Sequence, residues 1–427
     1  MKQTKGLNPF LPFDSYIPDG EPKVFGDRVY LYGSCDRFGG GYCCDEYHVF
    51  SAPLEDLTDW TDHGVSFSDR DVPWSDAVLY APDAVEKNGV YYLFLCLSDG
   101  TEGVAESDVP SGPFRNARQI TLNGEPITGI DPSVLAEGGR CYYTWGQFHL
   151  RMGELNDDMC TLKPESVHTD VLTNEDGAQG FHEGSSLRKI GDSYCMIYAS
   201  EYTDDWPHHG GRPTKLDYAV SKEPYGPYTR RGTVIDNDGC DPASWNNHGS
   251  VIRLGDDWYA FYHASSNNSE ASRRARAELL TVDEARCVIT QATPTTKGFV
   301  RQLTPEMLCS PVNACRFFGG AYVTQTPDGR FPAVELRSGA GFSFSPVSFP
   351  ARDYTFTVRG AFFADAALGL RIGDEEALRL PLKPCAKPAA FSARLTGREI
   401  TAPVTVTVYG KGDMPLCEID ELSFTPD

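Results

Sequence analysis

The sequence predicts an all-β protein: a five-bladed β-propeller followed by a small β-sandwich domain. Glycine and proline, 41 and 30 of 427 residues, are spread along the whole chain, as many turns between short strands require. A unit made of a glycine turn and an aromatic-rich strand recurs five times. Because one hydrophobic core rarely grows beyond roughly 250 to 300 residues, we expect two domains, over residues 1–300 and 310–427.

In each repeat, a polar turn that contains glycine joins a short strand to an aromatic-rich strand in which the residue pattern alternates. Residues 26–32, Gly-Asp-Arg-Val-Tyr-Leu-Tyr, are the first example of the turn and its second strand. The turn glycines are separated by 63, 50, 52 and 64 residues, which is the length of a four-stranded blade with its loops. A β-sandwich with similar hairpins is the alternative, but five units in this order favour a radial arrangement. The turn glycines are Gly26, Gly89, Gly139, Gly191 and Gly255.

The repeat ends near residues 295–311, and strands of a different pattern follow, for example 354–358 and 404–408. Their alternation of apolar and polar residues over roughly 115 residues is typical of a small β-sandwich. We expect this unit to brace the propeller, with independent glycan binding as the less favoured role.

The composition and charge of the chain limit the kinds of molecule that it is expected to bind. The formal net charge of −22 argues against nucleic acid and anionic membranes, whereas a neutral polymer is compatible with it. The sequence contains neither a signal-peptide pattern nor an apolar run of about 18 residues. Thirteen cysteines without regular spacing indicate free thiols, so we expect a cytoplasmic protein.

Three acidic residues occupy equivalent places at the beginning of predicted innermost strands: Asp19, Asp131 and Glu183. Innermost strands line the channel of a propeller, so these carboxyls should converge in one pocket. Glycoside hydrolysis requires one carboxyl that protonates the leaving oxygen and another that activates water or attacks. A third carboxyl nearby would raise the pKa of the acid. Taken singly, each residue is better explained as a surface or turn residue than as a catalytic one.

The motifs around these residues resemble glycoside hydrolase family 43, and the resemblance covers about residues 8 to 300. It implies an inverting mechanism, in which Asp19 is the general base, Glu183 is the general acid, and Asp131 tunes and orients the acid. The matching segments are 8–9 with Asp19, 81–83, 131–133 and 181–184.

The resemblance also implies further site residues. His248 matches a histidine that faces a central metal, often calcium, so it is a candidate for the pocket and for a metal, and no organic cofactor is implied. Arg273 resembles an arginine that hydrogen-bonds the sugar, with Arg274 and Arg276 as alternatives in register. Two aromatic residues of the second repeat complete the predicted substrate-binding set, Tyr80 and Trp74.

The resemblance implies an exo-glycosidase that releases a terminal pentose from plant-derived oligosaccharides, with α-L-arabinofuranose favoured and β-xylose second. A galactofuranosidase or exo-galactanase would use the same three carboxyls. A noncatalytic sugar-binding propeller and a retaining, fructan-acting enzyme fit less well. The base segment reads Asp-Gly-Glu-Pro, so Glu21 is a rival for the base, and Ser185 replaces the proline that often follows Glu-Gly in the family.

Overall fold

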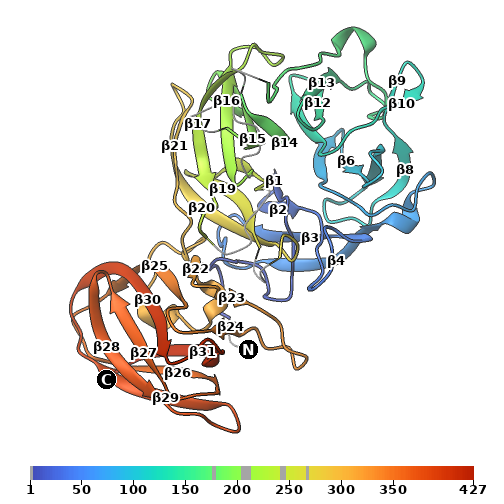
Figure 1. The fold of residues 1–427 in the computed structure, drawn as a ribbon. Coiled ribbons are helices and arrows are strands. Elements are labelled where there is room, and N and C mark those ends of the chain that lie inside the picture. Colours follow the sequence, from blue (N-terminus) through green and yellow to red (C-terminus); the bar gives the residue numbers. More distant parts are fainter. Residues whose placement is uncertain (1–2, 176–178, 203–212, 241–246, 266–268) are drawn as a thin grey trace.

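The computed structural model describes residues 3–175, 179–202, 213–240, 247–265 and 269–427. Within these ranges it consists of β-strands and short 3-10 helices, and no helix is long and apolar enough to cross a membrane. The strands form two units, a ring of sheets and a separate two-sheet body (Figure 1). The 3-10 helices are η1 (Asp69–Asp71), η2 (Pro164–Ser166), η3 (Pro305–Met307) and η4 (Pro311–Asn313).

The ring contains five antiparallel sheets, each built from strands that are consecutive in the chain. Blade 1 comprises β1 (Glu21–Phe25), β2 (Arg28–Tyr32), β3 (Glu46–Pro53) and β4 (Thr61–Ser68). Blade 2 comprises β5 (Asp83–Lys87), β6 (Val90–Cys96), β7 (Glu102–Ser107) and β8 (Arg115–Gln119). Blade 4 comprises β14 (Phe181–Ile190), β15 (Ser193–Ser200), β16 (Lys215–Ser221) and β17 (Thr229–Asp236). Blade 5 comprises β18 (Ser250–Leu254), β19 (Asp257–Ala264), β20 (Arg274–Asp283) and β21 (Val288–Thr290).

Blade 3 departs from the predicted four strands. Its sheet contains β11 (Ser133–Glu137), β12 (Arg140–Trp145) and β13 (Arg151–Glu154), and a separate hairpin, β9 (Thr121–Leu122) with β10 (Glu125–Pro126), precedes it. The fourth strand is reduced to a single bridge between Met152 and His168. Pro164, which has no N–H to give to a ladder, begins η2 where that strand would form.

The innermost strands close the ring, because β1 contacts β5, β5 contacts β11, β11 contacts β14, β14 contacts β18, and β18 contacts β1. Five hydrophobic clusters lie between successive pairs of blades. All five turn glycines of the repeat have positive φ, which glycine adopts without steric cost. The predicted five-bladed propeller is confirmed.

The C-terminal strands form two facing five-stranded sheets, as a small β-sandwich does. The strands are β22 (Arg316–Phe318), β23 (Tyr322–Val323), β24 (Ala333–Leu336), β25 (Gly341–Phe349), β26 (Tyr354–Phe362), β27 (Ala366–Ile372), β28 (Glu375–Leu382), β29 (Ala389–Leu395), β30 (Ile400–Gly410) and β31 (Cys417–Pro426). One sheet has the order β22-β25-β30-β27-β28, and the other has the order β23-β24-β31-β26-β29.

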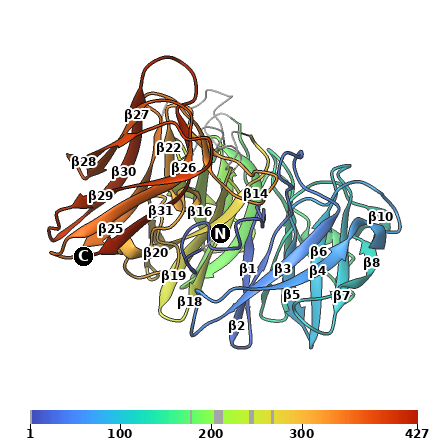
Figure 2. The same ribbon diagram turned by 90° about the horizontal axis from the view of Figure 1, so that it is seen from below.

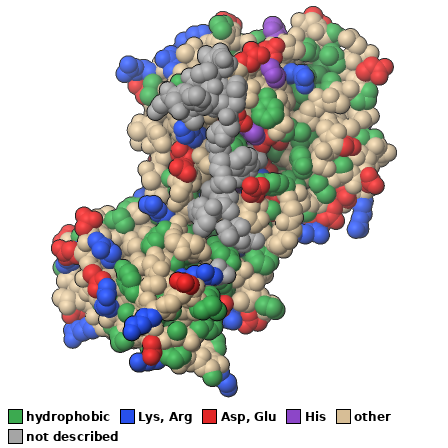
Figure 3. Space-filling model, viewed as in Figure 1, with side chains coloured by type: hydrophobic (Ala, Val, Ile, Leu, Met, Phe, Trp, Pro, Cys, Tyr) green, Lys and Arg blue, Asp and Glu red, His purple; other side chains and the backbone are tan. Residues whose placement is uncertain are grey.

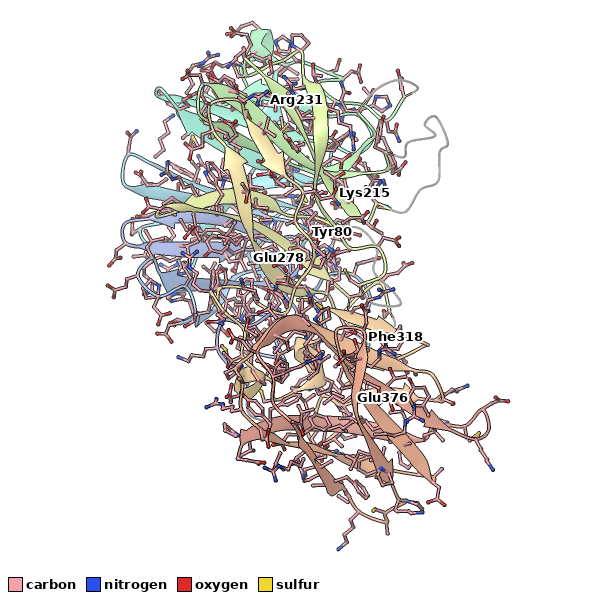
Figure 4. The ribbon with its side chains drawn as sticks, turned by 90° about the vertical axis from the view of Figure 1, so that its left-hand side faces the viewer. Tyr80, Lys215, Arg231, Glu278, Phe318 and Glu376 are labelled. Atoms are coloured by element: carbon pink, nitrogen blue, oxygen red, sulfur yellow. The ribbon has the colours of Figure 1, made fainter. Side chains whose placement is uncertain are left out.

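The sandwich packs beside the propeller (Figure 2) and shares hydrophobic core with the N-terminal segment. Leu7, Phe13 and Tyr16 belong to the same buried cluster as the sandwich core, and the rings of Phe13 and Phe331 lie 6.1 Å apart. The first residues of the chain therefore brace the second unit. Phe318 marks the junction in Figure 4, and in Figure 3 acidic and basic side chains are interspersed over the visible face.

Candidate active site

A pocket of about 180 Å³ brings together six of the seven predicted site residues. Residues from blades 1 to 5 reach it, since the loops before the innermost strands all open toward the same end of the ring. The volume is below the roughly 300 to 1,000 Å³ of clefts for drug-sized ligands, so it suits one sugar ring. The pocket is lined by Asp19, Tyr42, Cys43, Tyr80, Ala81, Ile130, Asp131, Gln147, Glu183, His248 and Arg273; Tyr80 is labelled within the propeller in Figure 4.

Asp19 is held as a carboxylate. Its backbone has φ 57°, and its N–H donates to Nδ1 of His263 at 3.1 Å. Arg273 Nη1 donates to Oδ1 at 2.9 Å, and the Ser34 hydroxyl donates to Oδ2. Burial alone would raise the pKa of Asp19, but Arg273, followed by His248 and the hydrogen bond from Ser34, outweighs burial, and the pKa is lowered. A buried carboxylate that remains ionised is suited to accept a proton from water.

His263 is a neutral hydrogen-bond acceptor. Burial, followed by the positive charge of Arg273, lowers the pKa of this histidine to about 3. Its Nδ1 therefore accepts the N–H of Asp19, and this bond supports the left-handed backbone there.

Arg273 is only 2% exposed and joins two carboxylates. Besides Asp19, it binds Asp36 through Nε at 2.8 Å and Nη2 at 3.0 Å, and its guanidinium lies 4.8 Å from the centre of the Tyr42 ring. The predicted role in binding sugar directly stays a prediction, because the donors shown are used to hold the base.

The other two arginines of this run point away from the pocket. Arg274 donates to the carbonyl of Phe13 and to the hydroxyl of Tyr16, and Arg276 donates to the carbonyl of Ala314. Alternation along β20 explains the difference, since successive side chains of a strand face opposite sides. Of these three arginines, Arg273 is the one that lines the pocket.

Asp131 also has a left-handed backbone, with φ 56°, and its N–H donates to the sulfur of Cys96 at 3.2 Å. Burial raises the pKa of Asp131 well above its ordinary value, and repulsion from Glu183 and Asp19 adds to this. The N–H of Gly184, which donates to Oδ2 at 3.1 Å, opposes the rise. Among the carboxyls of this pocket, Asp131 is therefore one whose neutral form the surroundings favour.

Glu183 projects from β14 at a point where the ladder to β15 is irregular. Gln147 Nε2 donates to its Oε2 at 2.6 Å, and Nε2 of His182 lies 3.6 Å from the same oxygen. The side chain of Glu183 is 8% exposed, so it combines burial with access to the pocket. The predicted role of Glu183 as general acid stays a prediction.

Gly184 allows β14, next to Glu183, and His248 of the fifth blade to approach each other. Its φ is 64°, and a Cβ at this position would lie 2.8 Å from the ring of His248. A side chain at position 184 would clash with His248, which explains why glycine follows Glu183. His248, packed against this glycine, places Nδ1 3.6 Å from Oδ1 of Asp19 and 3.9 Å from Oδ2 of Asp131.

Beneath the carboxyls, the channel contains two buried ion pairs. Glu21 pairs with Arg188, and Lys23 pairs with Asp83 at 2.8 Å. Arg188 also donates to Ser250 at 2.8 Å, and Lys23 donates to the carbonyl of residue 134 at 3.2 Å, so the network reaches all five blades. Glu21 is 2% exposed and does not line the pocket, which places the rival base in the structural network.

The donor set does not fit the calcium site implied for His248. Calcium takes six to eight oxygen ligands, whereas in the described ranges no group of three or more His, Cys, Asp or Glu side chains is arranged to hold a metal. Oε1 of Glu21 is a buried oxygen without a partner, but the carboxyls of Glu21 and Asp83 are already paired with Arg188 and Lys23. The geometry assigns His248 to the carboxyl cluster.

The prediction that Trp74 contacts substrate is wrong for this pocket. Its indole N–H donates to the Thr101 hydroxyl at 3.2 Å, and its ring packs over Gly103 in the cluster between blades 1 and 2. Large aromatic residues stabilise such inter-blade packing. Tyr80 lines the pocket from the same part of the sequence.

Sequence reasoning missed three polar residues that follow the second strand of a blade. Ser34 follows β2 and binds Asp19, Gln147 follows β12 and binds Glu183, and Glu201 follows β15 and binds His182. Their equivalent position in the repeat is a signal that could have found them. The loop after a second strand is therefore where this chain supports its acid and base.

Carboxyls from three blades that face one small pocket are the kind of site that glycoside hydrolysis requires. The model of glycosyl hydrolases family 43 matches residues 7–285. A xylosidase/arabinosidase from Thermoclostridium stercorarium is 34% identical over 316 residues, which span 65% of this chain and 65% of that protein. A xylosidase/arabinosidase from Humicola insolens is 29% identical over 306 residues, or 58% of this chain and 88% of its own. The chain belongs to glycoside hydrolase family 43, an inverting family.

Solved structures agree with this assignment. A β-xylosidase/α-arabinofuranosidase from a compost microbial metagenome, in complex with xylotriose and in a calcium-free form, matches with a TM-score of 0.57 and 26% identity. The match covers 69% of this chain and 99% of that one. An arabinoxylan arabinofuranohydrolase from Bacillus subtilis covers 98% of this chain and 97% of its own, with a TM-score of 0.56. At 20% identity, that second likeness shows only the fold.

Proposed function

We propose that this chain is an exo-acting, inverting glycosidase that releases a single terminal pentose, with Asp19 as base and Glu183 as acid. The observation that carries the proposal is the small pocket, in which the ionised carboxylate of Asp19 and the carboxyls of Asp131 and Glu183 face the same space. A pocket for one sugar ring favours cleavage at a chain end.

In the proposed reaction, Asp19 removes a proton from a water molecule as the water attacks the anomeric carbon. Glu183 gives its proton to the glycosidic oxygen of the leaving group. Arg273 and Ser34 keep Asp19 oriented, and the N–H of Gly184 holds Asp131 beside the acid. Inversion requires the Asp19 and Glu183 carboxyls to be roughly 6.5 to 9.5 Å apart, so that water fits between base and sugar.

The favoured sugar is α-L-arabinofuranose, and β-xylose is the second candidate. Relatives from Thermoclostridium stercorarium and Humicola insolens are named for both activities, and a family 43 enzyme from Xanthomonas citri has been solved with xylose. Tyr80 forms part of the wall that would distinguish the two rings. The galactan alternative has the weaker support, since the exo-β-1,3-galactanase likeness is 12% identical and shows only the fold.

The test is a panel of nitrophenyl pentosides and hexosides, with the anomer of the first product followed by NMR. We expect turnover of the α-L-arabinofuranoside or the β-xyloside, and a product of inverted configuration. Turnover of hexosides alone would overturn the choice of sugar. A retained anomer would show that one carboxyl acts as a nucleophile, as expected for carboxyls only about 5 Å apart.

A further inference from the structure

The loop that carries Gln147 also carries an unusual neighbour, Phe148. Its side chain is 36% exposed, which makes it one of the few large apolar residues at the surface of the described chain. Its backbone has φ 61°, a left-handed conformation that glycine and asparagine adopt far more readily than phenylalanine. An exposed aromatic residue in a strained position contributes little to folding.

Phe148 lies immediately outside the acid. Its ring meets the ring of His182 edge to face, with centroids 5.0 Å apart, and Nε2 of His182 is 3.6 Å from Oε2 of Glu183. Glu201 binds the other nitrogen of His182 and so fixes the orientation of that ring. The backbone of Phe148 is pinned as well, since its N–H donates to the carbonyl of His182 at 2.7 Å and its carbonyl accepts from the N–H of Asn174 at 3.2 Å.

The position of the acid decides which part of a substrate reaches Phe148. A general acid must lie within hydrogen-bond reach of the glycosidic oxygen, the atom that joins the sugar in the pocket to the leaving group. Gln147 lines the pocket and donates to Glu183, whereas Phe148, the next residue in the chain, is exposed and packs on His182 beside Glu183. A leaving group that emerges past Glu183 on the side of His182 would meet this ring.

We propose that Phe148, held by His182, is the platform on which the leaving-group sugar of an oligosaccharide stacks. This inference rests on the proposed exo-glycosidase function. A sugar ring exposes a face of C–H groups with partial positive charge, and the face of an aromatic ring is negative. The platform selects for carbohydrate leaving groups, and a leaving group too small to stack gains nothing from it.

The test compares Phe148→Asn with Phe148→Tyr on two substrates of the released pentose: the methyl glycoside and the trisaccharide. Asparagine tolerates the left-handed backbone, so Phe148→Asn should keep its melting temperature. We expect its kcat/KM on the trisaccharide to fall about tenfold more than on the methyl glycoside, which corresponds to about 1.4 kcal/mol. Phe148→Tyr keeps the ring and should preserve the wild-type ratio.

Phe363, 51% exposed on the sandwich, supplies the matched control, because Phe363→Ala removes an exposed ring far from the acid and should change neither rate. An equal loss on both substrates in Phe148→Asn would overturn the platform while leaving the glycosidase in place. A wild-type enzyme that cleaves neither pentoside substrate would instead refute the proposed function itself.

Discussion

Glu102 should make the enzyme less stable as the pH rises through neutrality. This residue is 1% exposed at the beginning of β7; it accepts a hydrogen bond from the Tyr143 hydroxyl, and its Oε1 is buried without a partner. Burial raises the pKa of Glu102 from 4.5 to about 8, although Tyr143 and Arg151 oppose the rise. The folded protein therefore holds this carboxyl in its neutral form at pH 7.

The sign and size of the effect follow from proton linkage. A group whose pKa is raised on folding contributes stability that is present in full below the unfolded pKa and is lost as the pH rises through the folded pKa. The difference of roughly 3.5 units, at 1.36 kcal/mol each, corresponds to about 5 kcal/mol as an upper bound. Between pH 4.5 and 8 the loss amounts to about 1.4 kcal/mol per pH unit.

Glu102→Gln replaces the neutral acid with a neutral amide, so it should remove this dependence. Urea unfolding at pH 5, 7 and 8.5 measures it: the two proteins should be similar at pH 5, and the variant should be more stable by about 3 to 5 kcal/mol at pH 8.5. A difference in unfolding free energy that does not change with pH would refute the reasoning. So would a variant that becomes less stable than the wild-type protein as the pH rises.

Glu154 is the matched control with the opposite sign. Burial alone would raise its pKa, but Lys163 and Arg140 outweigh burial and lower it. Its contribution is present above the unfolded pKa and is lost as the pH falls through the folded one. Glu154→Gln should therefore weaken the protein at pH 7, and the difference should vanish in acid.

Four further predictions concern the site. Glu183→Gln should abolish turnover of natural linkages but retain more activity on nitrophenyl glycosides, whose leaving groups need little protonation; equal losses in steady-state rates would contradict this. Asp19→Asn should lose both activities, whereas Glu21→Gln should lower the melting temperature by leaving Arg188 uncompensated; the opposite pattern would make Glu21 the base. Arg273→Met should raise the pKa of Asp19 and therefore move the acidic limb of the pH profile of kcat/KM to higher pH. An acidic limb at the same pH as in the wild-type enzyme would contradict this prediction. Chelation followed by excess calcium should change neither melting temperature nor turnover, and a rise in either on adding calcium would restore the metal site.

The features predicted from sequence are those that the repeat itself determines. A glycine turn followed by an alternating strand forms one hairpin wherever it occurs, so five copies define five innermost strands. Asp19, Asp131 and Glu183 could be found because ring closure brings equivalent positions of different blades to one end of the channel. Here local pattern and closed symmetry were sufficient.

The features that failed depend on contacts between distant residues. Trp74 is an aromatic residue of the kind that stacks on sugars, but only the packing of blade 1 against blade 2 decides that it packs there instead. Glu21 is separated from Asp19 by a single residue, and its role follows from Arg188, a partner 167 positions away. Blade 3 lacks a full fourth strand because Pro164 begins a 3-10 helix there, and counting the repeats in the sequence does not reveal this effect.

Non-glycine residues with positive φ occur both at the pocket and away from it. Outside the pocket, Asn88, Asn116 and Asn123 adopt this conformation, as local preference favours, and so do Met159, Asp170 and Cys287. Around the pocket the same conformation is adopted by Asp19, Asp131 and Phe148, which gain nothing locally from it. Each is instead fixed by a tertiary hydrogen bond from its own N–H, to His263, Cys96 and His182 respectively. Strain of roughly 1 to 3 kcal/mol per residue persists only where surrounding structure enforces it. Phe148 shares this feature with the two aspartates, but so do residues away from the pocket, and the proposed role of its exposed ring therefore rests on its contact with His182 beside Glu183.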